Sequence, residues 1–197
     1  MCYNYIYRSI SISNYGDVFM FGRLRSLDRK VLDNISRIHS PGMNMVMKTA
    51  SRSANVGLIW WLVCLPFLIN PNWRSIGFNY VIALCFAHVM GEGLIKHTVK
   101  RIRPCHELDD DEQIINRPRF YSFPSGHTTA SFAMVGVSIY RGLPPFVVLP
   151  VLAIAMLISF SRIYLRVHYL TDVIAGMFLG LICSGISVLF FHAIGLA

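Results

Sequence analysis

Three polar clusters hold the residues of this sequence whose types and spacing suit catalysis. They are Lys96-x6-Arg103-Pro104, Pro124-Ser125-Gly126-His127 and Ser161-Arg162-x5-His168-x3-Asp172. Together they supply three Lys or Arg cations, two imidazoles, hydroxyl groups and one carboxylate. Cations bind phosphate oxygens, and imidazoles transfer protons or attack phosphorus, so this set of groups suits a site that handles a phosphate.

The third cluster predicts an imidazole that is oriented by a carboxylate. His168 and Asp172 are four residues apart at the start of a predicted helix, so both side chains lie on one face. A hydrogen bond from one ring nitrogen to Asp172 would leave the other nitrogen free as a nucleophile or base. Arg162 ends the preceding helix, and only the turn 163–167 separates it from His168. Its guanidinium is therefore expected near the same point, where it can grip phosphate oxygens in a bidentate way.

The other two clusters predict an anion site and a proton donor. The second opens a predicted helix, whose unpaired backbone amides and dipole favour a negative charge. Ser125 can donate its hydroxyl, Gly126 lets the backbone approach closely, and His127 can give a proton to a departing oxygen. Lys96 and Arg103 add two cations that would neutralise charge on a phosphoryl group.

Each cluster taken alone has an ordinary explanation. A basic residue at a helix end commonly snorkels to the membrane interface, and a Pro-Ser-Gly run is common in turns. The order of the three clusters is much more specific, and it resembles the signature of the type-2 phosphatidic acid phosphatase superfamily. Every signature position is matched between Lys96 and Asp172, whereas residues 1–50 lie outside the signature.

The resemblance implies a role for each matched residue. His168 would attack phosphorus to form a phosphohistidine, oriented by Asp172, while His127 would protonate the leaving group and then help to activate water. The residues expected to bind the phosphoryl oxygens are Lys96, Arg103, Ser125, Gly126 and Arg162. In this scheme neither a metal nor another cofactor is required.

The resemblance also implies an integral membrane lipid phosphatase that hydrolyses a phosphomonoester or a diphosphate. Undecaprenyl diphosphate is the substrate favoured here. Phosphatidic acid and phosphatidylglycerol phosphate remain alternatives, because the motifs recognise the phosphate and not the lipid tail. A lipid phosphotransferase, in which an acceptor alcohol replaces water, is a second reading of the same site. A transporter or scaffold without catalysis is a third, less favoured because every signature residue is present.

The elements that must position these residues are predicted to be membrane helices. The chain has 197 residues, of which 54% are hydrophobic and 14% charged, and its mean hydropathy is +0.51. Five stretches without charged side chains are each close to the ~20 residues that cross a bilayer as a helix. We expect spans at about 54–70, 76–95, 125–140, 145–162 and 171–193. A soluble helical bundle would need polar outer faces, which these stretches lack.

The predicted fold class is therefore all-α: a polytopic membrane helix bundle with about five transmembrane helices and an N-terminal amphipathic interfacial helix. We expect a multi-pass protein of the cell membrane, divided into a basic N-terminal interfacial segment, 1–52, and a transmembrane phosphatase domain, 53–197. Within the first segment, apolar residues recur every three or four positions from Leu24 to Ile38. The alternative is that this helix packs against the bundle.

Five crossings would place all three clusters on one face of the membrane. That face would also hold all Lys and Arg residues except Arg74 and Arg141, and such a charge bias points toward the cytoplasm. The superfamily that the signature resembles includes polyprenyl diphosphate phosphatases, and this resemblance implies a site on the outer face of the membrane. Which face of the membrane holds the site is therefore left open. The net charge of +8 indicates anionic lipid headgroups as partners, and not nucleic acid, since no basic helix or aromatic-interleaved strand surface is evident.

Several further residues are given lesser roles. Glu92 lies four residues before Lys96 and is expected to pair with it, and Arg101 is expected to tune selectivity near the site. The acidic run 109–112 indicates a solvated loop better than a metal site. In the last span, the small residues of Gly176-x3-Gly180 and Ser184 predict close packing inside the bundle, with dimerisation as the alternative. Five cysteines without a C-x-x-C pair indicate neither a disulfide framework nor a zinc site.

Overall fold

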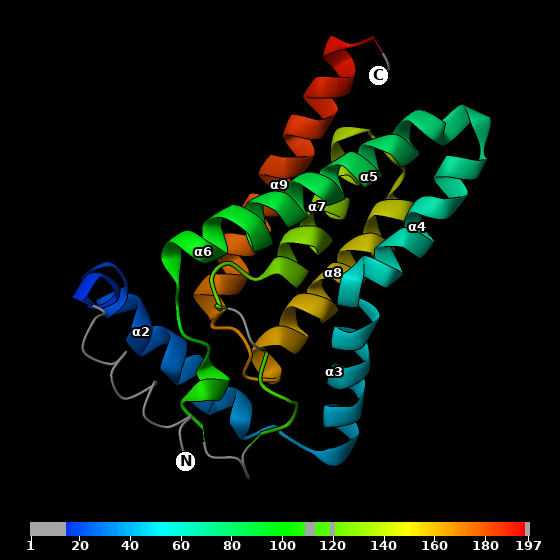
Figure 1. Ribbon diagram of the computed structural model, residues 1–197. Coiled ribbons are helices and arrows are strands. Elements are labelled where there is room, and N and C mark those ends of the chain that lie inside the picture. The colour runs from blue at the N-terminus through cyan, green and yellow to red at the C-terminus, as the bar shows by residue number, and fades with distance from the viewer. Residues whose placement is uncertain (1–14, 109–112, 119–120, 196–197) are drawn as a thin grey trace.

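The computed structural model is a bundle of helices, and no strand occurs in the part of the chain that it describes (Figure 1). It describes residues 15–108, 113–118 and 121–195, with the backbone alone for 15–23. The acidic run 109–112 thus lies outside the described residues. The helices are α2 (Tyr15–Ser36), α3 (Pro41–Ser53), α4 (Leu58–Ile69), α5 (Arg74–His88), α6 (Lys96–Val99), α7 (Gly126–Tyr140), α8 (Pro145–Tyr164) and α9 (Leu170–Ala193), joined by the short helices η1 (Asn55–Gly57), η2 (Pro71–Trp73), η3 (Val89–Ile95) and η4 (Pro104–His106).

Three helical runs of the described chain are long and apolar enough to cross a membrane. They are Pro71–Val99, Pro145–Tyr164 and Leu170–Ala193. A fourth arises if Pro41–Ser53 and Asn55–Ile69, which meet at an angle of 57°, are counted as one bent span. The first run is continuous because α5, the π-helical η3 and α6 follow one another without a break. A multi-pass membrane bundle is therefore confirmed. The lengths and bounds of the individual crossings differ from those expected from the sequence.

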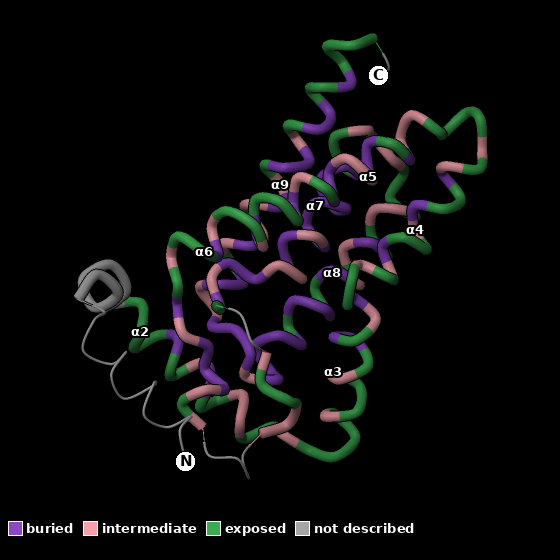
Figure 2. Tube along the Cα trace, viewed as in Figure 1, coloured by how far each residue is buried: buried purple, intermediate pink, exposed green. Residues whose placement is uncertain are grey.

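Helix α7, the third expected span, has only 15 residues and occupies the middle of the bundle (Figure 1). Fifteen residues of α-helix extend for about 22 Å, less than the ~30 Å of the hydrocarbon core. Ten of these residues are buried by the neighbouring helices, so most of α7 contacts protein (Figure 2). Helix α7 is therefore an internal helix that is too short to be counted among the membrane-crossing runs.

The small residues of α9 pack against α7 of the same chain. A β-carbon on Gly180 would overlap the carbonyl oxygen of Thr129, and one on Gly176 would lie 2.8 Å from the carbonyl oxygen of Ser125. Close approach of this kind strengthens van der Waals contact between membrane helices. The predicted packing role of this stripe is confirmed.

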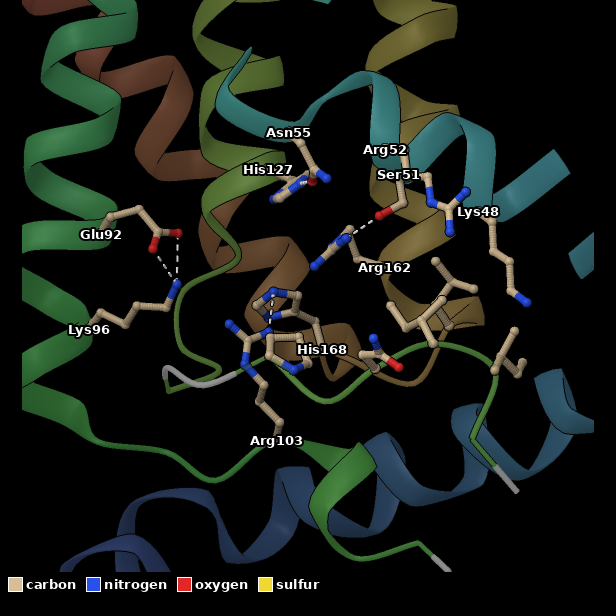
Figure 3. A pocket seen from close by; sticks show the side chains of 15 residues that line it. Lys48, Ser51, Arg52, Asn55, Glu92, Lys96, Arg103, His127, Arg162 and His168 are labelled. Carbon is tan, nitrogen blue, oxygen red and sulfur yellow. Dashed lines mark hydrogen bonds and ion pairs between the residues drawn. The ribbon is translucent and has the colours of Figure 1, made fainter. Parts of the chain in front are cut away.

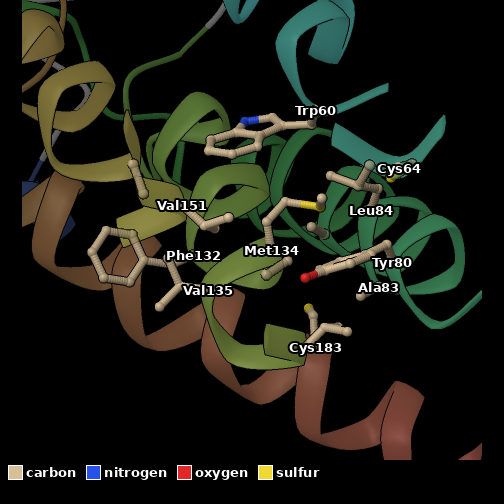
Figure 4. Packing of buried hydrophobic residues seen from close by; sticks show 14 of the residues in the cluster. Trp60, Cys64, Tyr80, Ala83, Leu84, Phe132, Met134, Val135, Val151 and Cys183 are labelled. Carbon is tan, nitrogen blue, oxygen red and sulfur yellow. The ribbon is translucent and has the colours of Figure 1, made fainter. Parts of the chain in front are cut away.

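The apolar core of the bundle lies between α4, α5, α7, α8 and α9. Trp60, Tyr80 and Met134 are among its largest side chains, and each is fully buried (Figure 4). The Tyr80 hydroxyl satisfies its hydrogen bonding with Oγ of Ser138 at 2.7 Å. Such bonds between helices matter in a membrane, because no water is available there to hydrogen-bond a hydroxyl that lacks a protein partner.

Apart from the short third span, α7, the largest difference from the sequence interpretation is the bend before α4. The span expected from residue 54 instead begins at Leu58, because Val56 and Gly57 adopt left-handed backbone angles, with φ of 54° and 72°. A β-branched residue seldom adopts this conformation, so the bend is held by its surroundings. The bend directs α3 away from the axis of α4 and across the end of the bundle (Figure 1).

Helix α2 covers part of the predicted interfacial segment and packs partly on the bundle. Leu32 is buried against Ile163, Tyr169 and Val173, whereas Leu24 is exposed. The packing alternative therefore holds for the middle of the apolar stripe. The division of the chain at residues 52 and 53 stays a prediction, as does the interfacial position.

The connections of the helices reproduce the expected arrangement of faces. Helices α2 and α3 and the segment between α6 and α7 lie at one end of the bundle, and the α4–α5 turn and the carboxyl end lie at the other (Figure 1). The three polar clusters therefore meet at a single end.

Candidate active site

A cleft of about 640 Å³ lies at this end of the bundle, and five of the eight predicted site residues line it. These are Lys96, Arg103, His127, Arg162 and His168 (Figure 3). They come from all three polar clusters of the sequence, so the cleft exists only when the bundle is assembled. Asp172, Ser125 and Gly126 are not among the residues that line it.

His168 lies at the bottom of the cleft and is almost fully buried. Its Nε2 is 2.9 Å from Nη1 of Arg103, which also donates to the carbonyl oxygen of Val167 at 2.9 Å. Because a guanidinium can only donate, Nε2 carries the lone pair and the proton is on Nδ1. The lone pair of Nε2 therefore points into the cluster of cations, where a phosphorus atom would be held.

Asp172 faces the other nitrogen of His168 but is bound mainly by other groups. Its Oδ2 is 3.6 Å from Nδ1 of His168, just beyond hydrogen-bond range, and accepts from the amide of Tyr169 at 2.9 Å. Its Oδ1 accepts from Nη1 of Arg101 at 2.5 Å. The carboxylate is thus fixed in place behind the imidazole, and a small movement of the ring would complete the hydrogen bond.

A buried carboxylate of α2 holds the arginine that binds Asp172. Asp28 is fully buried and accepts from Nη2 of Arg101 at 2.7 Å. It also accepts from the amide of Thr171 at 3.0 Å and from its hydroxyl at 2.7 Å. A network of ionised groups therefore runs from α2 through Arg101 to Asp172.

Lys96 already has an acidic partner in the cleft. Its Nζ lies 2.6 and 2.7 Å from the two carboxylate oxygens of Glu92, one helical turn earlier, so the expected pair is confirmed. Both residues lie at or beside the π-helical η3, a type of distortion that is frequent at functional sites. The carboxylate occupies a position that an incoming phosphate would compete for.

Arg162 projects into the centre of the cleft from the end of α8 (Figure 3). One of its terminal nitrogens donates to the hydroxyl of Ser51 on α3, and its Nε has no partner among the described residues. An arginine whose donors are only partly used can bind an anion without first breaking its existing contacts.

His127, at the start of α7, lies on the side of the cleft formed by α3. Its Nε2 is 3.0 Å from Oδ1 of Asn55, and an amide oxygen only accepts, so Nε2 carries a proton. Asn55 belongs to the bend between α3 and α4. The bend therefore has a direct role in fixing the expected proton donor.

Ser125 and Gly126 occupy positions that differ from a phosphate cradle. The amide of Ser125 donates to the carbonyl oxygen of Asp172 at 3.0 Å, and its buried hydroxyl accepts from Thr128 at 3.0 Å. A β-carbon on Gly126 would overlap the carboxylate of Glu92. In this structure Ser125 joins α7 to α9, and Gly126 makes room for Glu92; their expected role in phosphate binding stays a prediction.

The sequence interpretation did not assign several residues that complete the site. Lys48, Ser51, Arg52 and Asn55 bring α3 and the bend into the cleft. One signal was available for Asp28: it lies within the apolar stripe of α2, where a carboxylate needs a buried partner. No comparable signal marked the α3 residues, which read as part of a basic surface.

An apolar cavity of about 490 Å³ adjoins the polar cleft. It is lined mainly by Val56, Trp61, Leu84 and Val89, and it shares Glu92 and His127 with the cleft. The two cavities therefore meet at the expected proton donor, with the polar part on one side and apolar side chains on the other.

The cations and the burial of His168 together lower its pKa well below the ordinary value of 6.5. Burial disfavours the charged imidazolium, and the positive charges of Arg103, Arg162 and Lys96 act in the same direction. Both effects favour the neutral form of the imidazole, which is the form that could act as a nucleophile. Within the described residues there is no group of three or more His, Cys, Asp or Glu side chains suited to hold a metal ion.

Comparison with known proteins gives the class to which this fold and site belong. The family model of the PAP2 superfamily matches residues 73–195. The chain therefore belongs to the PAP2 superfamily, and the resemblance seen in the signature is confirmed.

Individual relatives are phosphatases or diphosphatases of lipid-linked phosphates by name. The chain is 34% identical to an undecaprenyl-diphosphatase of Sulfolobus acidocaldarius, over 66% of this chain and 62% of that protein. It is 30% identical to a lipid A 4'-phosphatase of Bacteroides thetaiotaomicron, over 80% of this chain and 73% of that protein. It is 39% identical to a decaprenylphosphoryl-5-phosphoribose phosphatase of Mycobacterium tuberculosis, over 73% of this chain and 77% of that protein.

A solved structure agrees with the fold. The transmembrane PAP2 type phosphatidylglycerolphosphate phosphatase of Bacillus subtilis superposes with a TM-score of 0.70, covering 87% of this chain and 88% of that one. The sequence identity is 23%, so this likeness concerns the fold alone.

Proposed function

We propose that this chain is a membrane-bound lipid phosphatase that works through a phosphohistidine on His168, with undecaprenyl diphosphate as its substrate. The observation that carries the proposal is the position of Nε2 of His168, 2.9 Å from Nη1 of Arg103 in a cleft that Lys96 and Arg162 also line. The Sulfolobus relative, an undecaprenyl-diphosphatase, supports this choice of lipid.

The first step transfers the terminal phosphoryl group to the imidazole. The three cations hold its oxygens while Arg103 shifts its hydrogen bond from Nε2 to one of them. Nε2 then attacks phosphorus, and the bond to the leaving oxygen breaks as His127 gives that oxygen a proton. Asp172, fixed by Arg101, stabilises the positive charge that develops on the ring.

The second step returns the enzyme to its starting state. A water molecule attacks phosphorus and gives a proton to His127, and the P–N bond breaks to release phosphate and the neutral imidazole. Apolar side chains beyond His127 offer a path for the lipid chain of the leaving group. All groups in both steps belong to the protein, the substrate or water.

Phosphate release in detergent tests the proposal, with undecaprenyl diphosphate, phosphatidic acid and phosphatidylglycerol phosphate compared, each with and without a chelator. We expect release that is fastest with the diphosphate, unaffected by the chelator and abolished in His168→Asn. Acid-labile labelling of the wild type by substrate that carries labelled phosphate, and its absence in His168→Asn, would identify the intermediate. Wild-type rates in His168→Asn would refute the mechanism, and transfer of phosphate to an added lipid alcohol in place of water would show a phosphotransferase.

A further inference from the structure

Two cations of α3 line the cleft without belonging to the three polar clusters. Lys48 and Arg52 are four residues apart, so they lie on the same face of α3, and both side chains border the cavity that contains His168 (Figure 3). They also lie outside residues 73–195, the part of the chain that the family model matches. Within the described part of the chain, neither forms a salt bridge or a side-chain hydrogen bond.

The charge of the cleft exceeds what one phosphate group needs. Lys96, Arg103 and Arg162 carry three positive charges, and Glu92 cancels one of them, which leaves a net charge of +2. A phosphomonoester carries about −1.5 to −2 at neutral pH, so these four residues already balance it. Lys48 and Arg52 raise the net charge to +4, which suits a substrate with a further anionic group.

Helix α3 holds these cations in a fixed relation to the catalytic groups. Ser51, directly before Arg52, accepts a hydrogen bond from Arg162. One turn before Ser51, Met47 is buried against Tyr164, whose hydroxyl donates to Asn44 at 2.7 Å. The helix is thus attached to α8 at two levels, and its basic face is directed into the cleft.

The position of the pair also fits the geometry of a diphosphate. Three residues beyond Arg52, Asn55 binds His127, the expected donor to the leaving oxygen. In a diphosphate that oxygen bridges the two phosphorus atoms, so the phosphate that is not transferred leaves from the side of His127. Lys48 and Arg52 border the cleft from this same α3 side, across from Lys96 and Glu92 (Figure 3).

We propose that Lys48 and Arg52 form a subsite for the second phosphate of a lipid diphosphate, and that they make the enzyme prefer diphosphates to phosphomonoesters. The inference rests on the proposed function and refines it, since it assigns the preference to a helix outside the catalytic signature. The phosphate bound there is part of the substrate and not the headgroup of a neighbouring lipid.

The test is the double variant Lys48→Gln, Arg52→Gln, assayed with undecaprenyl diphosphate and with undecaprenyl monophosphate in the same micelles. We expect kcat/KM for the diphosphate to fall by about 100-fold, roughly tenfold for each lost charge-assisted contact, mainly through KM. The value for the monophosphate should change by less than about threefold, because the remaining cations bind its single phosphate. Arg52→Lys should retain most of the activity.

The matched control is Lys30→Gln, Arg37→Gln, which removes two exposed cations of the same end of the molecule that do not line the cleft. It should leave both substrates unaffected. Equal losses with both substrates in the α3 variant would overturn the proposal and indicate a general attraction of anions. A loss of kcat/KM in the α3 variant that appears only in micelles containing phosphatidylglycerol would also overturn the proposal, and would indicate that the two cations bind a lipid headgroup.

Inhibition by free anions gives a second readout that does not need turnover of a monoester. Inorganic diphosphate should inhibit the double variant about 100-fold less strongly than the wild type, whereas inhibition by inorganic phosphate should not change. Unchanged inhibition by diphosphate would refute the subsite even if the enzyme is an active phosphatase. Activity that survives in His168→Asn would instead refute the proposed function, so the two failures are distinguishable.

Discussion

The network that begins at Asp28 leads to a specific expectation for Asp28→Asn. The carboxylate accepts three hydrogen bonds, from Arg101 and from the amide and hydroxyl of Thr171. Asparagine offers only one acceptor oxygen, so it can keep the bond from the Thr171 amide, and its own N–H groups then face the guanidinium. Arg101 keeps Asp172 as its one carboxylate partner in this network.

The size of the effect follows from these contacts. One charge-assisted hydrogen bond contributes about 1.5–3 kcal/mol, and donors that face each other in a buried site add to the loss. We expect the free energy of unfolding to fall by about 3 kcal/mol. We also expect kcat to fall about tenfold, because a looser Arg101 orients Asp172 less well, with KM unchanged since Asp28 does not touch the cleft.

Asp33→Asn is the matched control, an exposed carboxylate on the same helix. Thermal unfolding in detergent and steady-state phosphate release would be measured for both variants. If Asp28→Asn lowered neither kcat nor the unfolding midpoint more than Asp33→Asn, the network would have no part in positioning Asp172. A rise in KM at constant kcat would also contradict this account.

Three further perturbations test the packing and charge of the site. Gly180→Ala should cost about 3 kcal/mol of stability, because the new β-carbon overlaps the backbone of Thr129 and the helices must separate; an unchanged thermal midpoint would contradict the packing. Glu92→Gln should make inorganic phosphate inhibit about tenfold more strongly, since it removes the one carboxylate that lines the cleft in the described chain; weaker inhibition would show that Glu92 does not compete with phosphate for Lys96. His168 has a lowered pKa in the folded state, so the unfolded state binds its proton first and stability falls as pH drops below 6.5. In His168→Asn the free energy of unfolding should therefore fall less steeply as pH drops, by up to about 1.4 kcal/mol per pH unit. Thermal midpoints of wild type and variant that change in parallel from pH 7 to 5 would refute the lowered pKa of His168.

The sequence was sufficient to predict that these cations and imidazoles lie together, because their spacing is tied to helix ends. Lys96, His127 and Arg162 each lie near a point where an apolar run begins or stops, and helices of a bundle that turn at one face must bring such points together. The membrane class was predictable for the same reason, since continuous apolar runs have few alternatives. The order of the clusters then supplied the chemistry.

Other features depend on packing that no local pattern records. The bend at Val56 requires a left-handed residue that its β-branched type disfavours, so the sequence predicted one straight span in its place. The burial of Ser125 follows from how closely α9 approaches α7, and the role of Arg101 depends on a partner on α2. Long-range pairs of this kind become visible only when the helices are placed in space.

The contact between Asp28 and Thr171 also has a consequence for the time at which the protein becomes active. The two residues are 143 positions apart, so at ~10 residues per second the ribosome needs roughly 15 s to make the second after the first. Arg101 is made 73 positions after Asp28, but until the end of the interval the carboxylate lacks Thr171 and Arg101 has no Asp172 to hold. A chain whose synthesis stops before α9 therefore lacks this network, which is complete only after the last helix has entered the bundle.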